Sequence, residues 1–483
     1  MDLSVSDIMS ATPTRLVSGE REARLTGCAI DSRKVAAGDL FVAFVGESSD
    51  GNDYAAAAAE AGAACVVMTR EPSASELERI QAAGCAVLCY ASPEPDPERL
   101  LLSVASLWRS LHTTWVVVAV TGSVGKTTTK EMLAAALGTT YRVHATEGNY
   151  NSPIGMALTL LATPADADAV VLEMGMNHEG ELWRQTLAAR PNLAVITNIG
   201  TAHIGNLGSR EGIARAKAEV CAGLEASPFV PGGGRRLFMC GEDDFMPLIR
   251  REYCDPAGID MTLVGTQESD AVRAVGTTLD EGGHARLDVA FADGGTCPLA
   301  LSVPGTHVVP DALLAFAVAD LMRCDRAAVA DAIGATRPYQ MRLDVRSVPG
   351  SPRVLDDTYN ASPASMAGAL DVLCALPCEG RRIAVLGEMG ELGEEEARLH
   401  ALVGAYAAAK GLDMLAVVGQ GPAAEMVDGA KTMGMSSDRI ERFASVDDAV
   451  RTLVPILAPD DLVLVKASRA AELDRFVQEV LDR

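Results

Sequence analysis

The sequence lacks the segments that would place the protein in a membrane or mark it for export. Its 483 residues contain no uninterrupted apolar stretch approaching the ~20 residues that a membrane-spanning helix needs. The opening residues, MDLSVSDIMS, have neither the basic region nor the apolar core of a signal peptide. We therefore expect a cytoplasmic protein.

Paired cysteine motifs are also missing. None of the eleven cysteines belongs to a CxxC motif, and the closest spacings are Cys85 to Cys89 and Cys374 to Cys378. Neither pair has the histidine partners that a zinc site would need. We expect reduced thiols, as in a cytosolic protein.

Positive charge is in short supply. The chain has 41 Lys and Arg against 65 Asp and Glu, a formal net charge of -24. This balance argues against nucleic acid or an anionic membrane as a general partner. An anionic ligand such as a nucleotide would need positive charge concentrated at one place.

The order of strands and helices predicts an α/β protein of three domains, since the chain is too long for one typical core. From Trp115 onward, fully apolar strands alternate with helices, which indicates a parallel sheet covered on both faces. Alternating strands follow between residues 260 and 303, and after Pro338 a second doubly wound pattern begins. The turn-rich segment Ala91–Glu98 marks a boundary. The predicted domains are residues 1–95, 96–337 and 338–483.

The clearest motif is TGSVGKTTTK, from Thr121 to Lys130, which follows the apolar run WVVVAV and opens a helix. The amides around its glycines can form an anion-binding concavity at the helix N-terminus. Lys126 would reach terminal phosphates, and Thr127 would offer its hydroxyl to Mg²⁺. The alternative is an ordinary Gly-rich turn. Val120 stands where a Walker A motif has its first glycine, which suggests a different phosphate-loop lineage.

Acidic residues end two other strands. Glu173 ends an apolar strand and suits Mg²⁺, which prefers oxygen ligands. Asp356 and Asp357 end RVLDD, where they can hold a ribose hydroxyl or a metal, or cap the next helix. Both interpretations of this pair stay open.

Three further polar residues are ambiguous when taken singly. His178 and His203 lie in loops, and each can be a catalytic or metal-binding group or an ordinary structural histidine. Lys217 lies on a predicted helix, where a lone lysine usually belongs to a solvated face.

In combination these segments resemble the Mur ligase family, and most closely its MurF branch. The resemblance rests on TGSVGKTTTKEM, EGNYNSPIG, EMGMNHEGEL, TNIGTAHIGNLGS, AKAE, DDTYNASPASM, LGEMGELG and VKASR, in this order, and covers nearly the whole chain. The segment DSRKVAAGDLFVAFVGESSDG resembles the UDP-binding domain of the MurE and MurF branches. The architecture that this implies is a UDP-substrate-binding domain, a central P-loop ATPase domain and a C-terminal Rossmann-like domain.

The resemblance implies an ATP-dependent amide ligase of peptidoglycan precursor synthesis. ATP would phosphorylate the terminal carboxylate of UDP-N-acetylmuramoyl-tripeptide, and the amine of D-alanyl-D-alanine would attack the acyl phosphate. Phosphorylation makes chemical sense, because a free carboxylate resists attack by an amine. The implied cofactors are ATP and Mg²⁺, the partners are small-molecule substrates, and the implied state is a monomer. Either meso-diaminopimelate or lysine fits as the third residue of the tripeptide.

Residue roles also follow from the resemblance, position by position. Lys126, Lys217, His203 and Arg342 are implied in catalysis. The implied ATP-binding residues are Thr121, Gly122, Ser123, Val124, Gly125, Lys126, Thr127, Thr128, Arg342 and Asp357. The implied metal ligands are Thr127, Glu173, His203 and Lys217, the last as a carbamylated lysine. The implied substrate-binding residues are Ser32, Arg33, Asn151, Ser152, Asn360, Lys466, Ser468 and Arg469.

Several positions depart from the family pattern. Asp311, after Pro310, stands where the family commonly has an asparagine that donates to adenine, which puts adenine recognition there in doubt. Met341 stands where glycine often precedes the arginine. Ala467 replaces a common glycine, and Asn52 stands in place of a histidine.

Two alternative functions remain. One is a related ligase with another acceptor, of the MurE or folylpolyglutamate synthase kind, which the choice of amine would distinguish. The other is a nucleotide-binding regulatory protein with a decayed site, against which the intact polar residues argue. The ligase interpretation also predicts domain closure about a hinge at Gly334–Pro338.

Overall fold

The computed structural model describes residues 1–46, 48–92 and 94–483. Glu47 and Pro93 lie outside the described residues, and Pro93 belongs to the predicted boundary segment. The chain divides into two units. The first comprises Met1–Val120, Tyr141–Ala194 and Glu219–Arg236, and the second comprises Thr121–Thr140, Val195–Ala218 and Leu237–Arg483. Both predicted domain boundaries fall within a unit, so the three predicted ranges stay a prediction.

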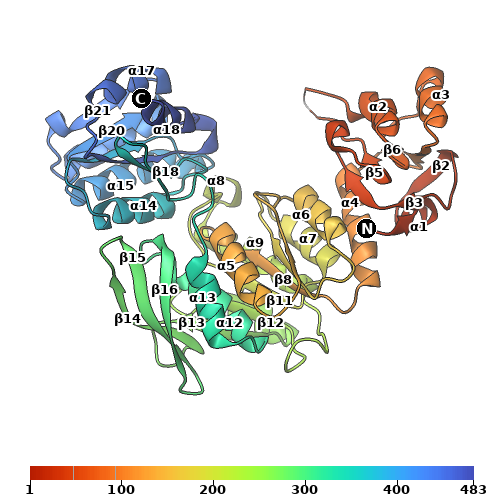
Figure 1. Ribbon diagram of the computed structural model, residues 1–483, viewed down its shortest axis with the longest axis horizontal. Helices are drawn as coiled ribbons and strands as arrows, with labels where there is room; N and C mark the ends of the chain where they lie inside the picture. Colours follow the sequence, from red (N-terminus) through yellow and green to blue (C-terminus); the bar gives the residue numbers. More distant parts are fainter. Residues whose placement is uncertain (47, 93) are drawn as a thin grey trace. The chain divides into compact units, whose positions relative to one another are not determined.

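A five-stranded sheet organises the amino-terminal part of the first unit (Figure 1). Its strand order is β2(Thr14–Ser18), β7(Ala86–Tyr90), β6(Cys65–Met68), β5(Asp39–Val42) and β4(Gly27–Ala29). Only β2 runs antiparallel to its neighbour. The helices are α1(Val5–Ala11), α2(Ala55–Glu60) and α3(Ala74–Ala82), and β1(Leu3–Ser4) pairs with β3(Arg24–Leu25). The Ala-rich run forms α2, and its Ala55 and Ala58 pack with Phe41, Val66 and Ile80 in one core.

The middle of the chain alternates strands and helices, as its apolar periodicity predicts. The elements are α4(Pro97–Leu111), β8(Val116–Thr121), α5(Lys126–Gly138), β9(Val143–Ala145), α6(Pro153–Ala162), β10(Ala169–Glu173), α7(Glu181–Ala189), β11(Leu193–Ile196), α8(Ile204–Leu207) and α9(Arg210–Ala218). Strand β10 pairs in parallel with β8 and β9. Helix α4 packs against α6 and α7. The parallel arrangement brings the carboxyl ends of β8 and β10 to one edge, where Val120 is in register with Glu173.

The same sheet continues into antiparallel strands. Its full order is β16-β15-β14-β13-β12-β11-β8-β10-β9. The further elements are β12(Arg236–Cys240), α10(Met246–Ile249), α11(Asp255–Ala257), β13(Asp260–Gly265), β14(Val272–Leu279), β15(His284–Phe291), β16(Thr296–Pro304), α12(Val309–Leu321) and α13(Arg326–Ala335). Strands β14, β15 and β16 pair antiparallel. Both α12 and α13 pack against α5, so the helix that carries Lys126 is supported along its length (Figure 1).

The carboxyl-terminal part is a doubly wound α/β fold, as predicted. Its sheet has the order β17-β18-β22-β19-β20-β21, parallel except for β17. The elements are β17(Asp344–Arg346), β18(Arg353–Asp357), α14(Pro363–Ala375), β19(Arg382–Leu386), α15(Glu396–Ala409), β20(Met414–Val418), α16(Glu425–Thr432), β21(Ile440–Phe443), α17(Val446–Leu453), β22(Leu462–Lys466) and α18(Asp474–Leu481). Helices α14 and α15 lie on one side of this sheet, and α17 and α18 on the other (Figure 1).

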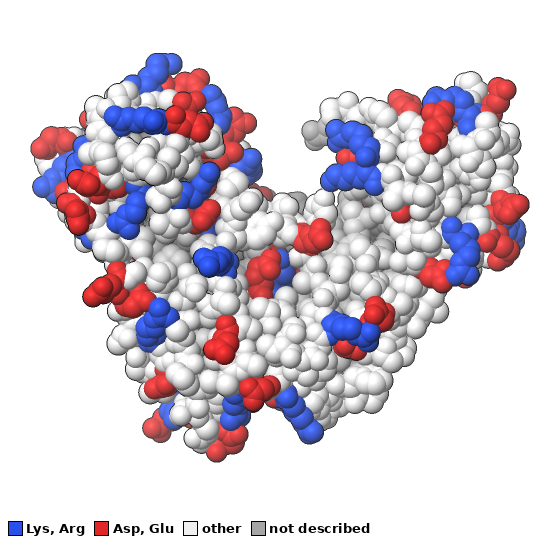
Figure 2. Space-filling view, in the orientation of Figure 1, with Lys and Arg blue, Asp and Glu red and all other residues white. Residues whose placement is uncertain are grey.

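Within the described residues, no helix combines the length and the apolar character that a membrane crossing requires. The face drawn in Figure 2 carries Lys and Arg side chains interspersed with Asp and Glu.

Candidate functional site

The segment Thr121–Thr128, the phosphate loop, joins β8 to α5 and uses glycine at its two left-handed positions. Gly125 has φ 87° and is the residue on which α5 begins. Gly122 has φ 146°, and a Cβ there would lie 1.8 Å from Thr197 Oγ1. Val120, by contrast, is a fully buried strand residue. The position of the missing Walker A glycine therefore lies in the strand, where a β-branched residue is favoured.

Residues after β11 hold the phosphate loop in shape. Ser123 N donates to Asn198 O at 3.0 Å, and Val124 N donates to Asn198 Oδ1 at 3.1 Å. Asn198 Nδ2 returns a bond to Val124 O at 2.8 Å, and Gly200 N donates to Ser123 Oγ at 2.9 Å. Reasoning from the sequence missed this support from Asn198. The available signal was a polar residue directly after a parallel strand, at the sheet edge where ligand residues gather.

Two lysines lie close to this loop. Lys126 Nζ donates to the carbonyls of Gly122, at 2.9 Å, and Ser123, at 3.3 Å. Lys217 on α9 is 1% exposed. Burial, and secondarily the nearby charge of Lys126, lowers the pKa of Lys217 well below its ordinary value. The alternative of a solvated helix lysine is therefore wrong, and the lowered pKa favours the uncharged amine of Lys217.

His203 lies at the start of α8 with φ 65°. Its Nδ1 is 2.5 Å from Glu391 Oε2, which belongs to the loop after β19. Gly205 N also donates to Glu391 O at 2.9 Å, and a Cβ on Gly205 would lie 2.6 Å from Gly393 N. The loop that carries His203 is thus packed directly against the carboxyl-terminal fold. His178, in contrast, is exposed in its loop.

In the first unit, Glu173 is fully buried at the end of β10. Its Oε1 accepts from Asn151 Nδ2 at 2.8 Å, and its backbone N donates to Thr146 Oγ1 at 2.9 Å. Ser152 Oγ accepts from Gly155 N and so caps α6. Asn151 and Ser152 therefore have structural partners, and Asn151 orients the predicted metal-binding carboxylate.

The predicted substrate residues Ser32 and Arg33 form a short turn capped by Asp31. Arg33 is exposed, and its Nε and Nη2 donate to the two Asp31 oxygens at 2.9 and 2.8 Å. This pairing lowers the pKa of Asp31 to about 2. The next residue, Lys34, places Nζ 3.4 Å from Tyr150 OH. The DSRK turn and the GNYN loop are thereby neighbours.

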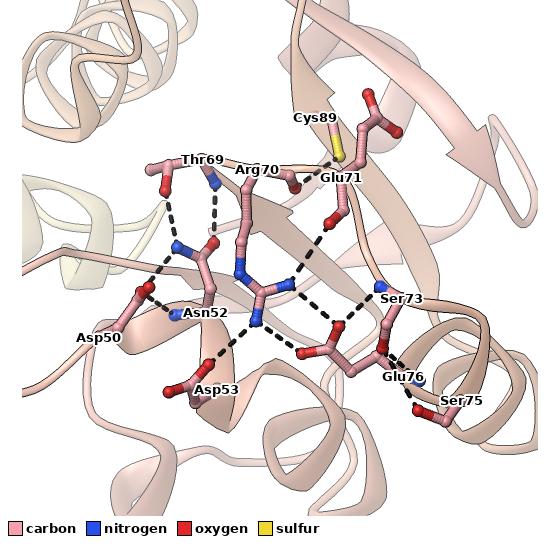
Figure 3. A network of polar contacts seen from close by, with 10 residues as sticks. All are labelled: Asp50, Asn52, Asp53, Thr69, Arg70, Glu71, Ser73, Ser75, Glu76 and Cys89. Carbon is pink, nitrogen blue, oxygen red and sulfur yellow. Dashed lines mark hydrogen bonds and ion pairs between the residues drawn. The ribbon is translucent and has the colours of Figure 1, made fainter.

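Asn52, which stands in place of a family histidine, is a buried structural residue (Figure 3). Its Nδ2 donates to Asp50 Oδ1 and to Thr69 Oγ1, both at 2.7 Å, and its Oδ1 accepts from Thr69 N at 2.9 Å. The neighbouring Arg70 joins Asp53 to Glu76. The amide therefore fixes the start of α2 against the end of β6.

The strand-end acids of the carboxyl-terminal fold are held by partners distant in sequence. Asp357 Oδ2 accepts from Lys466 Nζ at 2.6 Å, and Lys466, which is 2% exposed, also donates to Asn360 O. Asp356 Oδ1 accepts from the Thr358 hydroxyl at 2.7 Å. The alternative that these acids cap the next helix is wrong, because Ser362 caps α14.

The remaining predicted residues of this fold are more open. Asn360 and Arg469 are exposed, Ser468 is half-buried, and Arg469 Nη1 lies 3.1 Å from Asp474 Oδ2. Ala467 is fully buried, and a Cβ on Gly387 would lie 2.7 Å from its Cβ. Arg342 lies in the segment that joins α13 to β17, with its guanidinium 4.0 Å from the centre of the Tyr359 ring.

Asp311 is buried on α12, directly behind the phosphate loop. A Cβ on Gly125 would lie 2.4 Å from Asp311 Oδ1. Burial raises the pKa of Asp311 to about 8, against a smaller opposing effect of the Thr129 hydroxyl. Asp311 is therefore largely protonated at neutral pH and can donate a hydrogen bond, as the asparagine common in the family can.

The hinge prediction needs correction at its start. Helix α13 continues to Ala335, and Gly334 O accepts from Ser302 Oγ at 2.6 Å. A Cβ on Gly334 would lie 2.6 Å from Ala300 O. Gly334 therefore belongs to the body formed by α13 and β16, and a hinge can begin only after this helix.

Comparison with known proteins accounts for almost the whole chain. Residues 24–92 match the Mur ligase family catalytic domain, 120–319 the Mur ligase middle domain, and 341–469 the Mur ligase glutamate ligase domain. The UDP-N-acetylmuramoyl-tripeptide–D-alanyl-D-alanine ligase of Bacillus subtilis is 33% identical, over 94% of this chain and 93% of the relative.

Solved structures agree with this result. MurF from Acinetobacter baumannii superposes with a TM-score of 0.86 at 27% identity, covering 100% of this chain and 99% of that one. MurF from Thermotoga maritima, solved in complex with ADP, gives a TM-score of 0.76 at 25% identity and covers 94% of this chain and 97% of that one.

Proposed function

Because the chain belongs to the Mur ligase family, we propose that it joins D-alanyl-D-alanine to UDP-N-acetylmuramoyl-tripeptide at the expense of ATP. The observation that carries the proposal is the match of nearly the whole chain to a ligase named for that activity. The phosphate loop supports the same chemistry, because Lys126 bonds to its carbonyls and the pKa of the buried Lys217 beside it is lowered.

The proposed reaction has two steps. A terminal carboxylate oxygen of the tripeptide forms a bond to the γ-phosphorus as the bond between the β- and γ-phosphates breaks, and ADP leaves. The dipeptide amine then attacks the acyl carbon and loses a proton, and inorganic phosphate leaves as the amide forms. The protein contributes mainly by positioning the reactants and by stabilising charge.

The phosphate loop supplies the nucleotide-binding groups in this proposal. We propose that Gly122, Ser123, Val124, Gly125, Lys126, Thr127 and Thr128 surround the phosphates at the start of α5, whose dipole favours an anion. The amides of Ser123 and Val124 bond to Asn198 and so help to hold the shape of the loop. Thr121 closes the strand before them. The Lys126 side chain already bonds to the carbonyls of this loop, so we propose that it binds the terminal phosphates.

The residues present fit Mg²⁺. Thr127 and Glu173 offer hydroxyl and carboxylate oxygens, which Mg²⁺ prefers, and we propose them with His203 and Lys217 as its ligands. Within residues 1–46, 48–92 and 94–483, no three His, Cys, Asp or Glu side chains form a metal-binding group. Mg²⁺ does not require one, because it usually binds one or two carboxylates together with substrate phosphates. When bound, it would neutralise the charge of the triphosphate.

Lys217 has a second property relevant to this site. Burial lowers its pKa and so favours the uncharged amine, the form that captures CO₂ as a carbamate with formation of an N–C bond and loss of a proton. The carbamate would convert a cation into an anionic oxygen ligand, which is the role that the family resemblance implies for Lys217.

The other roles remain proposals that the local contacts refine. Arg342 would contact the γ-phosphate, and Asp357 would lie near the ribose. Ser32, Arg33, Asn151 and Ser152 would face the UDP-muramoyl end, and Asn360, Lys466, Ser468 and Arg469 the dipeptide end. The pairing of Lys466 with Asp357 favours a role in holding that carboxylate. We also propose the domain ranges 1–95, 96–337 and 338–483, a monomer, and a cytoplasmic site of action, where ATP and UDP-linked precursors occur.

One assay tests the proposed function. ADP release is measured with ATP, Mg²⁺ and UDP-muramoyl-tripeptides that carry either meso-diaminopimelate or lysine, with D-alanyl-D-alanine present or withheld. We expect turnover only with the dipeptide, and loss of turnover in Lys126→Ala. With ¹⁸O in the terminal carboxylate, one labelled oxygen should appear in inorganic phosphate. Turnover with glutamate or a diamino acid instead of the dipeptide would contradict the proposal.

A further inference from the structure

Arg342 is held by an aromatic ring and not by a counter-charge. Its guanidinium lies 4.0 Å from the centre of the Tyr359 ring, within the range of a cation–π interaction. Across the described part of the chain, Arg342 has no ion pair with a carboxylate, and its buried Nε has no hydrogen-bond partner. The guanidinium is therefore positioned by the ring while no carboxylate engages its N–H donors.

The backbone on both sides of Arg342 is fixed to the loop after β18. Met341 and Leu343 have φ 61° and 52°, left-handed values that are strained for a residue with a side chain. Tyr359 N donates to Met341 O at 3.2 Å, and Leu343 N donates to Asp357 Oδ1 at 3.2 Å. These contacts hold the strained conformation in place.

Tyr339, three residues before Arg342, also has a cation beside its ring, but that cation lies on α5 and not in the carboxyl-terminal fold. Tyr339 has the fully buried Lys130 of α5 at 5.9 Å from its ring centre. The segment Tyr339–Leu343, the arginine segment, thus starts against the helix of the phosphate loop and ends against the carboxyl-terminal fold. Gln340 is the residue between Tyr339, which contacts α5, and Met341, which bonds to the loop after β18.

We propose that Tyr359 is a positioning residue: its ring sets the place of Arg342, so that Arg342 and Asp357 move together as one part of the carboxyl-terminal fold. The inference rests on the proposed function, in which Arg342 contacts the γ-phosphate. A carboxylate partner would compete with phosphate for the guanidinium through charge-assisted hydrogen bonds. A ring supports only the face of the guanidinium and leaves its edge free.

The first test is kinetic. Tyr359→Leu removes the ring, and we expect kcat/KM for ATP to fall roughly tenfold. Tyr359→Phe keeps the ring and should stay within about twofold. In an Arg342→Ala background, Tyr359→Leu should cause no further loss, because the ring acts only through the arginine. Equal losses from Tyr359→Leu in both backgrounds would overturn the proposal.

A matched control is available on α15. The ring of Tyr406 has Lys410 Nζ 4.7 Å from its centre, so it is also a tyrosine beneath a cation in the same fold. Tyr406→Leu should leave kcat/KM for ATP unchanged. A loss equal to that of Tyr359→Leu would indicate a general effect of removing a tyrosine from this fold and would overturn the positioning role.

The second test does not depend on catalysis. Trypsin cleaves after arginine, and release of the fragment that ends at Arg342 is followed by mass spectrometry. Tyr359→Leu should accelerate this cleavage severalfold, and Tyr359→Phe should not. Unchanged cleavage in Tyr359→Leu would overturn the proposal. If cleavage accelerates but Arg342→Ala keeps full ligase turnover, the proposed role of Arg342 fails and the positioning by Tyr359 stands.

Discussion

The phosphate loop and the arginine segment both need left-handed backbone, and they achieve it with different residues. The loop has glycine at both left-handed positions, Gly122 and Gly125. The arginine segment has Met341 and Leu343. Glycine adopts this conformation without steric cost, whereas a residue with a Cβ is strained.

The two segments differ in what fixes their backbone conformation: residues of the segment itself in the phosphate loop, and tertiary contacts in the arginine segment. The loop can adopt its shape from its own residues, and Asn198 adds hydrogen bonds to it. The arginine segment keeps its shape because Tyr359 and Asp357, outside the segment, bond to its backbone. We therefore expect changes near the loop to act through packing and charge, and changes near the arginine segment to act through its distant partners.

The largest expected effect concerns Asp311 behind the loop. Its pKa is raised to about 8 in the folded protein, so the folded state retains a proton that an unfolded Asp with an ordinary pKa of ~3.9 releases. The stability advantage of wild type over Asp311→Asn should be greatest below pH 4 and fall as the pH rises toward 8. The total change should be on the order of 5 kcal/mol. Urea unfolding of both proteins between pH 4 and 9 measures it, and parallel curves would contradict the assignment.

The next effect concerns the anchor of the arginine segment. Lys466→Met leaves Asp357 buried without its counter-charge, which should destabilise the fold by about 3–5 kcal/mol. The matched control is Lys410→Met. Lys410 pairs with Asp371 at 2.5 Å, but both side chains are more exposed than those of Lys466 and Asp357. That change should cost less than about 1 kcal/mol. Similar losses in both variants in urea unfolding would show that burial of the pair is not the cause.

A smaller effect is expected from alanine in the phosphate loop. Gly125→Ala forces a side chain onto φ 87° and brings its Cβ against the Asp311 carboxyl, so we expect a loss of about 2–4 kcal/mol. Gly138→Ala is the control on the same helix, because its Cβ would meet nothing within 4 Å and its φ is ordinary. It should be neutral or stabilising by up to about 1 kcal/mol. Thermal unfolding compares the two variants.

The smallest effect tests the strained residue itself. Met341→Gly relieves roughly 1–2 kcal/mol of left-handed strain but adds entropy to the unfolded chain, so the net gain should be at most about 1 kcal/mol. Met433→Gly, at φ -85°, has no strain to relieve and should destabilise slightly. A loss of stability in Met341→Gly equal to that in Met433→Gly would show that Met341 is not strained.

The sequence predicted most strands that lie in parallel sheets, because apolar runs between helices are a strong local pattern. It predicted the phosphate loop for the same reason, since all of its parts are consecutive. It did not predict the burial of Lys217, which depends on what packs around α9. The pairing of Asp357 with Lys466 joins residues 109 positions apart, and no local pattern reports such a contact.

By itself, the sequence determined the α/β class, the strand–loop–helix unit that carries Lys126, and the family resemblance, because each depends on residue types at short, fixed spacings. Only the tertiary structure decided that Lys217 and Asp311 are buried, that Asn198 braces the phosphate loop, and that Tyr359 lies beneath Arg342. The physical reason is that burial, a pKa and a cation–π contact depend on neighbours brought together by folding.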